Sequence, residues 1–151
     1  MTVRSEARAA RSQESLVADG WQPLEAVGYT EFVGQVYFRS DGESMRYGFI
    51  AEERHKNRRS VIHGGVLAAF ADRALALAGR RVNNNMPQAT IELSVRFVDA
   101  AHIGEFIETA PEVVRKTRSV IFVRGILTAG GRAVASADGI WKILAPPKTA
   151  S

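Results

Sequence analysis

The sequence predicts an α+β domain in which one long central helix is wrapped by an antiparallel β-sheet. Three observations carry this prediction. Two segments between residues 29 and 52 have strand composition and flank a turn, residues 66–78 are alanine-rich and apolar on most sides, and four more strand-like segments follow residue 87. The 151 residues, 46% of them hydrophobic and 24% charged, suit one folded domain of ordinary composition.

The expected domain spans residues 21–145 and has a short extension at each end. Residues 1–20 lack a regular hydrophobic period, so we expect a flexible or short helical N-terminal segment there. Residues 146–151 begin with two prolines and are expected to form a C-terminal tail.

The first element of the domain is expected to be a β-hairpin. Tyr29–Arg39 and Glu43–Glu52 are rich in aromatic and β-branched residues, which favour strands. Ser40–Gly42 between them have the composition of a turn.

The long helix is predicted over Val66–Ala78. His63-Gly64-Gly65 open it, and Gly79 is expected to end it. Its apolar side chains lie nearly all round, which is typical of a buried helix, and its many alanines would let the strands of a sheet approach closely.

Four strands are predicted after the loop at residues 83–87. They are Gln88–Val98, Gly104–Lys116, Ser119–Thr128 and Arg132–Leu144. In the first of them, residues 90–97 alternate polar and apolar side chains, so one face is apolar and the other polar. The turn at Ala129–Gly131 makes the last two antiparallel neighbours.

The composition excludes several classes of function. Cysteine is absent, so disulfides, thiolate nucleophiles and cysteine-bound metals are excluded. The three histidines lack metal-binding spacing, and the motifs of serine hydrolases, P-loop nucleotidases and dinucleotide enzymes are missing, so we expect neither metal nor cofactor. The sequence has no apolar run of about 18 residues and no signal-peptide pattern, so we expect a cytoplasmic protein without a membrane partner.

The net charge of +4 says little about partners, because most basic residues are scattered among acids. The one dense basic run, Arg54–Arg59, contains no aromatic residue that could stack on bases. We therefore expect a solvated loop or a patch for a small anionic ligand, and no nucleic-acid partner. Steeply salt-dependent binding to nucleic acid would support the opposite interpretation.

The start of the predicted helix is a candidate site for a carbonyl oxygen. The first N–H groups of a helix have no partner within it and carry the positive end of its dipole. Glycine there lets a ligand approach the backbone, so Gly65 could donate to a carbonyl oxygen as it becomes an oxyanion. The alternative is that Gly64-Gly65 only form a tight entry turn, and that His63 is a hydrogen-bonded structural residue.

Asp72 is the candidate catalytic acid. It lies two helical turns after Gly65, on the same helix face. An acid in an apolar helix is costly unless something satisfies it. It could activate water or attack a carbonyl directly. The alternative is a structural ion pair with Arg73 or another buried arginine.

These residues together resemble a known family. The pattern Asn57-x5-His63-Gly64-Gly65-x6-Asp72, the strand Thr90–Phe97, the step Ile103–Glu105 and the segment Arg118–Val120 are similar to those of the hotdog-fold acyl-CoA thioesterase superfamily, in particular its PaaI-type (phenylacetate-pathway) branch. The resemblance extends over residues 29–142. It departs from the family at Ser60, where relatives commonly have glycine, and at Ala100, where they often have proline.

The resemblance implies the hydrolysis of acyl-CoA thioesters, aryl-acyl-CoA included, at a site shared between two protomers of a homodimer or homotetramer. It implies Asp72 as general base or nucleophile, Gly65 as the backbone donor and His63 as the brace of that turn. It further implies that Asn57 helps to place the water and that Thr90 holds it. Gly64 and Arg118 complete the expected substrate contacts.

Two points stay open beside the resemblance. The charge and proximity of Arg58 and Arg59 suggest that they meet CoA phosphates, although a solvated loop explains the same residues. The alternative function is a non-catalytic module that binds acyl-CoA or another ligand, in which Arg73 neutralises Asp72.

Overall fold

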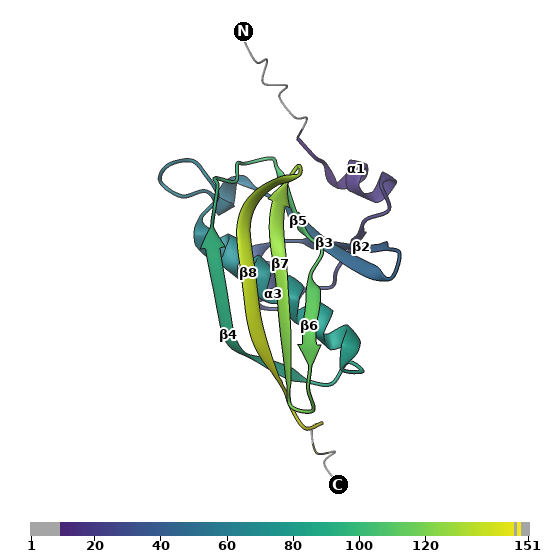
Figure 1. Cartoon of the computed structure of the whole chain (residues 1–151). Coiled ribbons are helices and arrows are strands. Elements are labelled where there is room, and N and C mark those ends of the chain that lie inside the picture. The colour runs from purple at the N-terminus through teal and green to yellow at the C-terminus, as the bar shows by residue number, and fades with distance from the viewer. Residues whose placement is uncertain (1–9, 147, 149–151) are drawn as a thin grey trace.

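The predicted α+β architecture is confirmed by a computed structural model, which describes residues 10–146 and 148. The long helix α3 (Gly64–Val82) lies across one face of an eight-stranded antiparallel sheet (Figure 1). The strand order is β1-β2-β3-β5-β7-β8-β4, with β6 paired to β7 beside this path. The strands are β1 (Gln22–Pro23), β2 (Val36–Asp41), β3 (Ser44–Ile50), β4 (Gln88–Phe97), β5 (Phe106–Thr109), β6 (Glu112–Lys116), β7 (Val120–Ala129) and β8 (Arg132–Ile143).

The N-terminal segment contains the short helix α1 (Gln13–Ala18), and residues 1–9 lie outside the described residues. Ser12 and Ser15 form a capping box at its start. Leu16 is fully buried and packs in a small cluster with Trp21, Tyr37 and Phe106. This part of residues 1–20 is therefore packed on the domain. Most of the expected C-terminal tail, residues 147 and 149–151, lies outside the described residues.

The predicted hairpin forms, but it starts later than the sequence suggested. β2 and β3 pair with Asp41 opposite Ser44 across the expected turn. The expectation of a strand from Tyr29 is wrong, because residues 29–33 form the helix α2 (Tyr29–Val33). Gly28 and Gly34 at its ends have positive φ angles, which turn the chain into and out of one helical turn.

The helix α3 is longer than predicted at both ends. It begins at Gly64 and continues through Gly79, so the prediction that Gly79 ends it is wrong. A side chain at Gly79 would meet Gln88 at 3.4 Å, which indicates that this glycine serves close packing. The buried face consists of Leu67, Phe70, Ala71, Ala74, Leu75, Ala78 and Gly79. No helix within the described ranges is long and apolar enough to cross a membrane.

The segment Gly104–Lys116, predicted as one strand, is two. β5 pairs with β3 and β7, whereas β6 pairs with β7 only. Pro111 lies in the break between them, and proline cannot donate a hydrogen bond to a sheet ladder. The other three predicted strands form within a few residues of their expected bounds.

The two edges of the sheet differ in length. β1, at one edge, has two residues and contains Pro23. β4, at the other edge, has ten residues and pairs only with β8 among the described strands. Ile91 and Phe97 on β4 are 59% and 55% exposed.

Candidate active site

The start of α3 is closed by its own histidine. His63 is the N-cap residue, and its Nδ1 accepts a hydrogen bond from the Gly65 N–H at 2.9 Å. The N–H group that the sequence suggested for a carbonyl oxygen is therefore bonded to the cap. Within residues 10–146, no hydrogen bond uses the Gly64 N–H. Gly64 thus offers the unused donor at the positive end of the helix.

Phe97 lies close to Gly64, so a methyl group at position 64 fits only if the exposed Phe97 ring shifts slightly. A Cβ atom at Gly64 would meet the end of the Phe97 ring at 3.0 Å. Phe97 is the last residue of β4 and stays largely exposed. The sequence showed it only as one apolar residue of an alternating strand, because nothing local relates positions 64 and 97.

The turn before α3 is organised by Asn57. Its Oδ1 accepts hydrogen bonds from the backbone N–H groups of Arg59 at 2.8 Å and Val61 at 3.4 Å. Ser60 in this turn has a φ of 60°, in the left-handed region that favours glycine. Arg58 is exposed beside this turn.

The buried His55 links three segments at this end of the molecule. It belongs to the short 3-10 helix η1 (Glu53–His55). Its Nδ1 accepts from the Glu52 N–H at 3.0 Å, and its Nε2 lies 2.6 Å from the Val33 carbonyl oxygen, which makes Nε2 the protonated nitrogen. Its own carbonyl accepts from the His63 N–H at 2.8 Å. Sequence reasoning considered His55 only as a metal ligand and missed this role.

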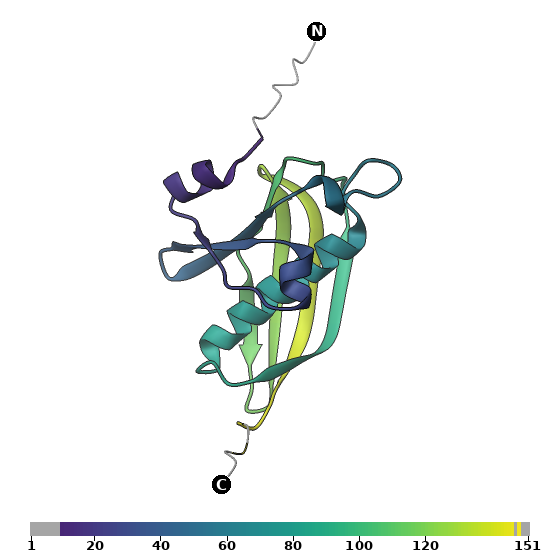
Figure 2. The same cartoon turned by 180° about the vertical axis from the view of Figure 1, so that it is seen from behind.

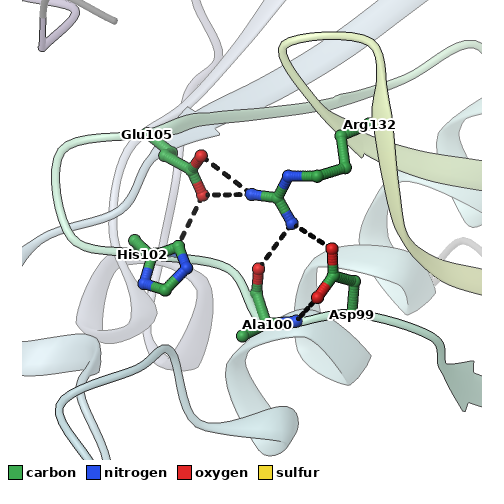
Figure 3. A network of polar contacts seen from close by, with 5 residues as sticks. All are labelled: Asp99, Ala100, His102, Glu105 and Arg132. Atoms are coloured by element: carbon green, nitrogen blue, oxygen red, sulfur yellow. Dashed lines mark hydrogen bonds and ion pairs between the residues drawn. The ribbon is translucent and has the colours of Figure 1, made fainter. Parts of the chain in front are cut away.

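A network around Arg132 holds the loop that supports the start of α3 (Figure 3). Arg132, the first residue of β8, donates from Nη1 to Asp99 Oδ2 at 2.8 Å and to the Ala100 carbonyl at 2.7 Å, and from Nη2 to Glu105 Oε1 at 2.9 Å. Within the loop, the Ala101 carbonyl accepts from the Ile62 N–H at 2.8 Å, directly before His63. Arg132 therefore fixes the support of the helix start.

Two chemical details of this loop follow from the network. The hydrogen bond from Arg132 holds the pKa of Asp99 below its ordinary value, and the Ala100 N–H acts in the same direction. That N–H donates to Asp99 Oδ1 at 2.8 Å, a bond that a proline could not make. An alanine at position 100 thus allows a hydrogen bond that the proline expected from the resemblance would remove.

Asp72 lies half-buried in the middle of α3, and Thr90 is its partner. The Thr90 hydroxyl, on β4, donates to Asp72 Oδ1 at 2.7 Å. Arg73 does not pair with Asp72. Its Nη2 donates to the Glu25 carbonyl at 2.6 Å, and Asp72 has no ion pair among the described residues. The carboxyl group of Asp72 is therefore held by a neutral hydroxyl and not by a cation among the described residues.

A small cavity of about 80 Å³ adjoins Asp72. It lies between α2, α3 and the β2–β3 hairpin, and its walls are mostly apolar. The lining residues are Tyr29, Thr30, Val33, Val36, Phe49, Val66, Ala69, Phe70, Asp72 and Arg73. An acid beside an apolar cavity can act on a reactive carbonyl whose hydrocarbon part is bound there.

Arg118 is not brought to this region within one chain. It lies in the exposed turn between β6 and β7, which Figure 1 places at the opposite end of the sheet from the start of α3. In the part of the chain that the structure describes, no three His, Asp or Glu side chains gather in a way that could hold a metal ion.

Comparison with known proteins identifies relatives of this chain. A family model described as the thioesterase superfamily matches residues 60–136, a little over half of the 151 residues. The chain is 29% identical over 131 residues to a Pseudomonas aeruginosa protein named "Putative esterase PA0474", and this match covers 84% of the chain and 97% of the relative. It is 25% identical over 77 residues to acyl-coenzyme A thioesterase 13 of Mus musculus, which covers 51% of the chain and 55% of the mouse protein.

Solved structures share the fold. Zebra fish thioesterase superfamily member 2 superposes with a TM-score of 0.72 at 23% identity, over 80% of this chain and 89% of that one. A mutant of the phenylacetic acid degradation protein PaaI from Thermus thermophilus superposes with a TM-score of 0.63 at 20% identity, over 87% of this chain and all of that one.

Proposed function

The chain belongs to the thioesterase superfamily and has its hotdog fold, and from this membership we propose that it hydrolyses acyl-CoA thioesters to the free acid and CoA. The observation that carries the proposal is Asp72, a carboxylate without a cationic partner that borders an apolar cavity. The name of the mouse relative, an acyl-coenzyme A thioesterase, supports CoA as the thiol part of the substrate.

Asp72 would supply the reacting oxygen. The Thr90 hydroxyl occupies Oδ1, so Oδ2 is left to accept a proton from water as a general base or to attack the carbonyl carbon as a nucleophile. The Gly64 N–H would stabilise the oxyanion, because the Gly65 N–H already serves the His63 cap. This assignment moves the donor one residue from the position that the resemblance implied.

One chain alone does not bring these two groups together. Gly64 and Asp72 are eight residues apart on one helix, which separates them by about 12 Å along its axis. A single thioester carbonyl group is too short to contact both residues across that distance. We therefore propose that the acid of one protomer and the helix start of a second form each site, in a dimer paired through the open edge of β4. Arg58 and Arg59 beside the helix start would then meet the CoA phosphates.

The test is the release of free thiol from a panel of acyl- and aryl-CoA substrates by the wild type and by Asp72→Asn. Loss of a positioned acid or base lowers the rate by about 10²–10⁴-fold. Undiminished turnover by Asp72→Asn would refute the assignment. Tight binding of CoA esters without turnover by either protein would favour the alternative, a non-catalytic acyl-CoA-binding module.

A further inference from the structure

Residues 24–36, which we call the strap, form one wall of the cavity beside Asp72. The strap contains α2 and crosses α3 on the side away from the sheet (Figure 2). Three side chains from elsewhere in the chain donate hydrogen bonds to backbone carbonyls of the strap. The donors are the guanidinium of Arg73 to the Glu25 carbonyl, Arg54 Nη1 to the Phe32 carbonyl at 3.2 Å, and His55 Nε2 to the Val33 carbonyl. Side chains of α3 and η1 therefore position the middle of the strap, and Tyr29, Thr30 and Val33 of α2 line the cavity.

The size of the cavity restricts what it can hold. Its volume of about 80 Å³ is roughly half that of an engineered apolar cavity that binds benzene, about 150 Å³. Val33, Val66 and Phe70 give it apolar walls. It therefore suits a compact acyl group of a few carbon atoms.

Arg73 adds a cationic group to this mostly apolar cavity. It lines the cavity, and while Nη2 is engaged by Glu25, Nη1 is buried without a hydrogen-bond partner among the described residues. Burial also lowers the pKa of Arg73, because its charge is partly removed from water. A buried cationic donor without an acceptor is unfavourable, and an oxygen atom of a bound molecule would relieve it.

We propose that this cavity is the acyl subsite and that Arg73 selects short acyl groups carrying an oxygen atom over plain hydrocarbon ones. The inference rests on the proposed thioesterase function and names its substrate class. A hydroxyl, keto or carboxylate oxygen of the acyl group accepts from Nη1, while the thioester carbonyl lies at Asp72. Arg73 directly follows Asp72 in the sequence, and both line the cavity, so Arg73 would contact the acyl group close to the thioester bond.

The competing explanation is that Arg73 only tethers the strap. The two explanations differ in which substrates they affect. If Arg73 only tethers the strap, its replacement should lower kcat/KM equally for all acyl groups. If Arg73 donates to the acyl group, its replacement should change the ratio of kcat/KM between oxygenated and plain substrates of equal length.

The experiment compares three four-carbon substrates: butyryl-CoA, 3-hydroxybutyryl-CoA and succinyl-CoA. kcat/KM is measured for the wild type, Arg73→Met, Arg73→Lys and the control Arg80→Met, which removes an exposed charge from the last turn of the same helix. Thermal unfolding of each variant confirms that it is folded. Arg73→Lys keeps the positive charge but replaces the two terminal nitrogens of the guanidinium with one, which cannot occupy both the Glu25 position and the cavity position.

We expect the wild type to prefer at least one oxygenated substrate over butyryl-CoA by about 10-fold or more, the usual contribution of a hydrogen bond to a charged group. Arg73→Met and Arg73→Lys should remove that preference, and Arg80→Met should retain it. The hydroxyl and carboxylate substrates distinguish a neutral from an anionic acceptor. No preference in the wild type, or an equal loss on all three substrates in Arg73→Met, would overturn the inference while leaving the thioesterase proposal intact. If the wild type hydrolyses no acyl-CoA at all, the proposed function itself fails.

Discussion

The start and the middle of α3 are built in opposite ways. At the start, hydrogen bonds from several segments converge on the backbone: His63 caps Gly65, His55 holds His63, and the loop held by Arg132 holds Ile62. In the middle, Asp72 has one hydroxyl partner and borders a cavity whose wall is tethered at a few carbonyls. Under the proposed function, this difference would provide a preorganised hydrogen-bond donor at the helix start and an adjustable cavity wall beside the acid.

The largest effect expected at the helix start comes from Gly64→Pro. Proline is favoured at the first position of a helix, and the extended backbone of His63 (φ −63°, ψ 133°) suits a residue before proline. The change removes the Gly64 N–H and should lower kcat by about 10²–10³-fold. Steady-state kinetics measure it, with Gly64→Ala as the control that keeps the N–H. Equal activities of the Pro and Ala variants would contradict the donor assignment.

Combining the Asp72→Asn and Gly64→Pro chains tests whether the acid and the donor of one site come from different protomers. Co-expressed Asp72→Asn and Gly64→Pro chains should recover part of the wild-type activity, because one site of each mixed dimer has both the acid and the donor. Thiol release by the purified mixture is the measurement. A mixture as inactive as its components would place both groups of a site on one chain.

Arg132→Met should weaken the support of the helix start. It removes charge-assisted bonds to Asp99, Ala100 and Glu105, and we expect the free energy of unfolding to fall by about 1–3 kcal/mol. Denaturant unfolding measures this loss. Arg124→Met, which removes the exposed pair with Glu112, is the control and should change stability by less than about 1 kcal/mol.

Thr90→Val tests the middle of the helix with a smaller effect. The replacement keeps the shape but removes the hydroxyl that holds Asp72. One such hydrogen bond contributes about 1 kcal/mol, so kcat should fall about 5-fold with little change in stability. Thr90→Ser keeps the hydroxyl and should stay near the wild type in the same assay. A Val variant as active as the Ser variant would show that this bond does not matter for turnover.

The smallest expected effect is the loss of the stability contribution of Asp99 at low pH. Because the pKa of Asp99 is lowered in the folded protein, its contribution to stability is complete above the ordinary value of 3.8 and is lost as pH falls through the lowered value. Asp99→Asn should therefore be less stable than the wild type at neutral pH, with the difference shrinking below about pH 4. Tm measured across pH 2–7 tests this. A difference that stays constant over that range would exclude the charged bond as its source.

The sequence predicted the parts of this fold that depend on local periodicity. The apolar pattern of the long helix and the alternation in β4 specify their elements without help from distant residues. The strap was missed because Tyr29–Val33 has strand composition, yet two glycines turn it into a helix over α3. Gly79 was misjudged because its packing against Gln88 is a tertiary contact.

The site divides in the same way. The spacing of Gly65 and Asp72 is visible in the sequence, whereas Thr90 came only from the resemblance. The structure joins Thr90 to Asp72 by a hydrogen bond that no local pattern indicates. Which glycine N–H is free depends on the orientation of the His63 ring, and the support by Arg132 joins residues about thirty positions apart. Sequence patterns carry no signal for either.

The unequal edges of the sheet limit how far assembly can proceed. Two chains that pair through β4 use the same strand on each side, so a two-fold axis closes the contact. The combined sheet would then end on both sides in β1, a two-residue strand with a proline that cannot donate to another strand. At that edge β1 opposes further strand addition, so the proposed contact through β4 would join two chains without continuing the sheet beyond β1.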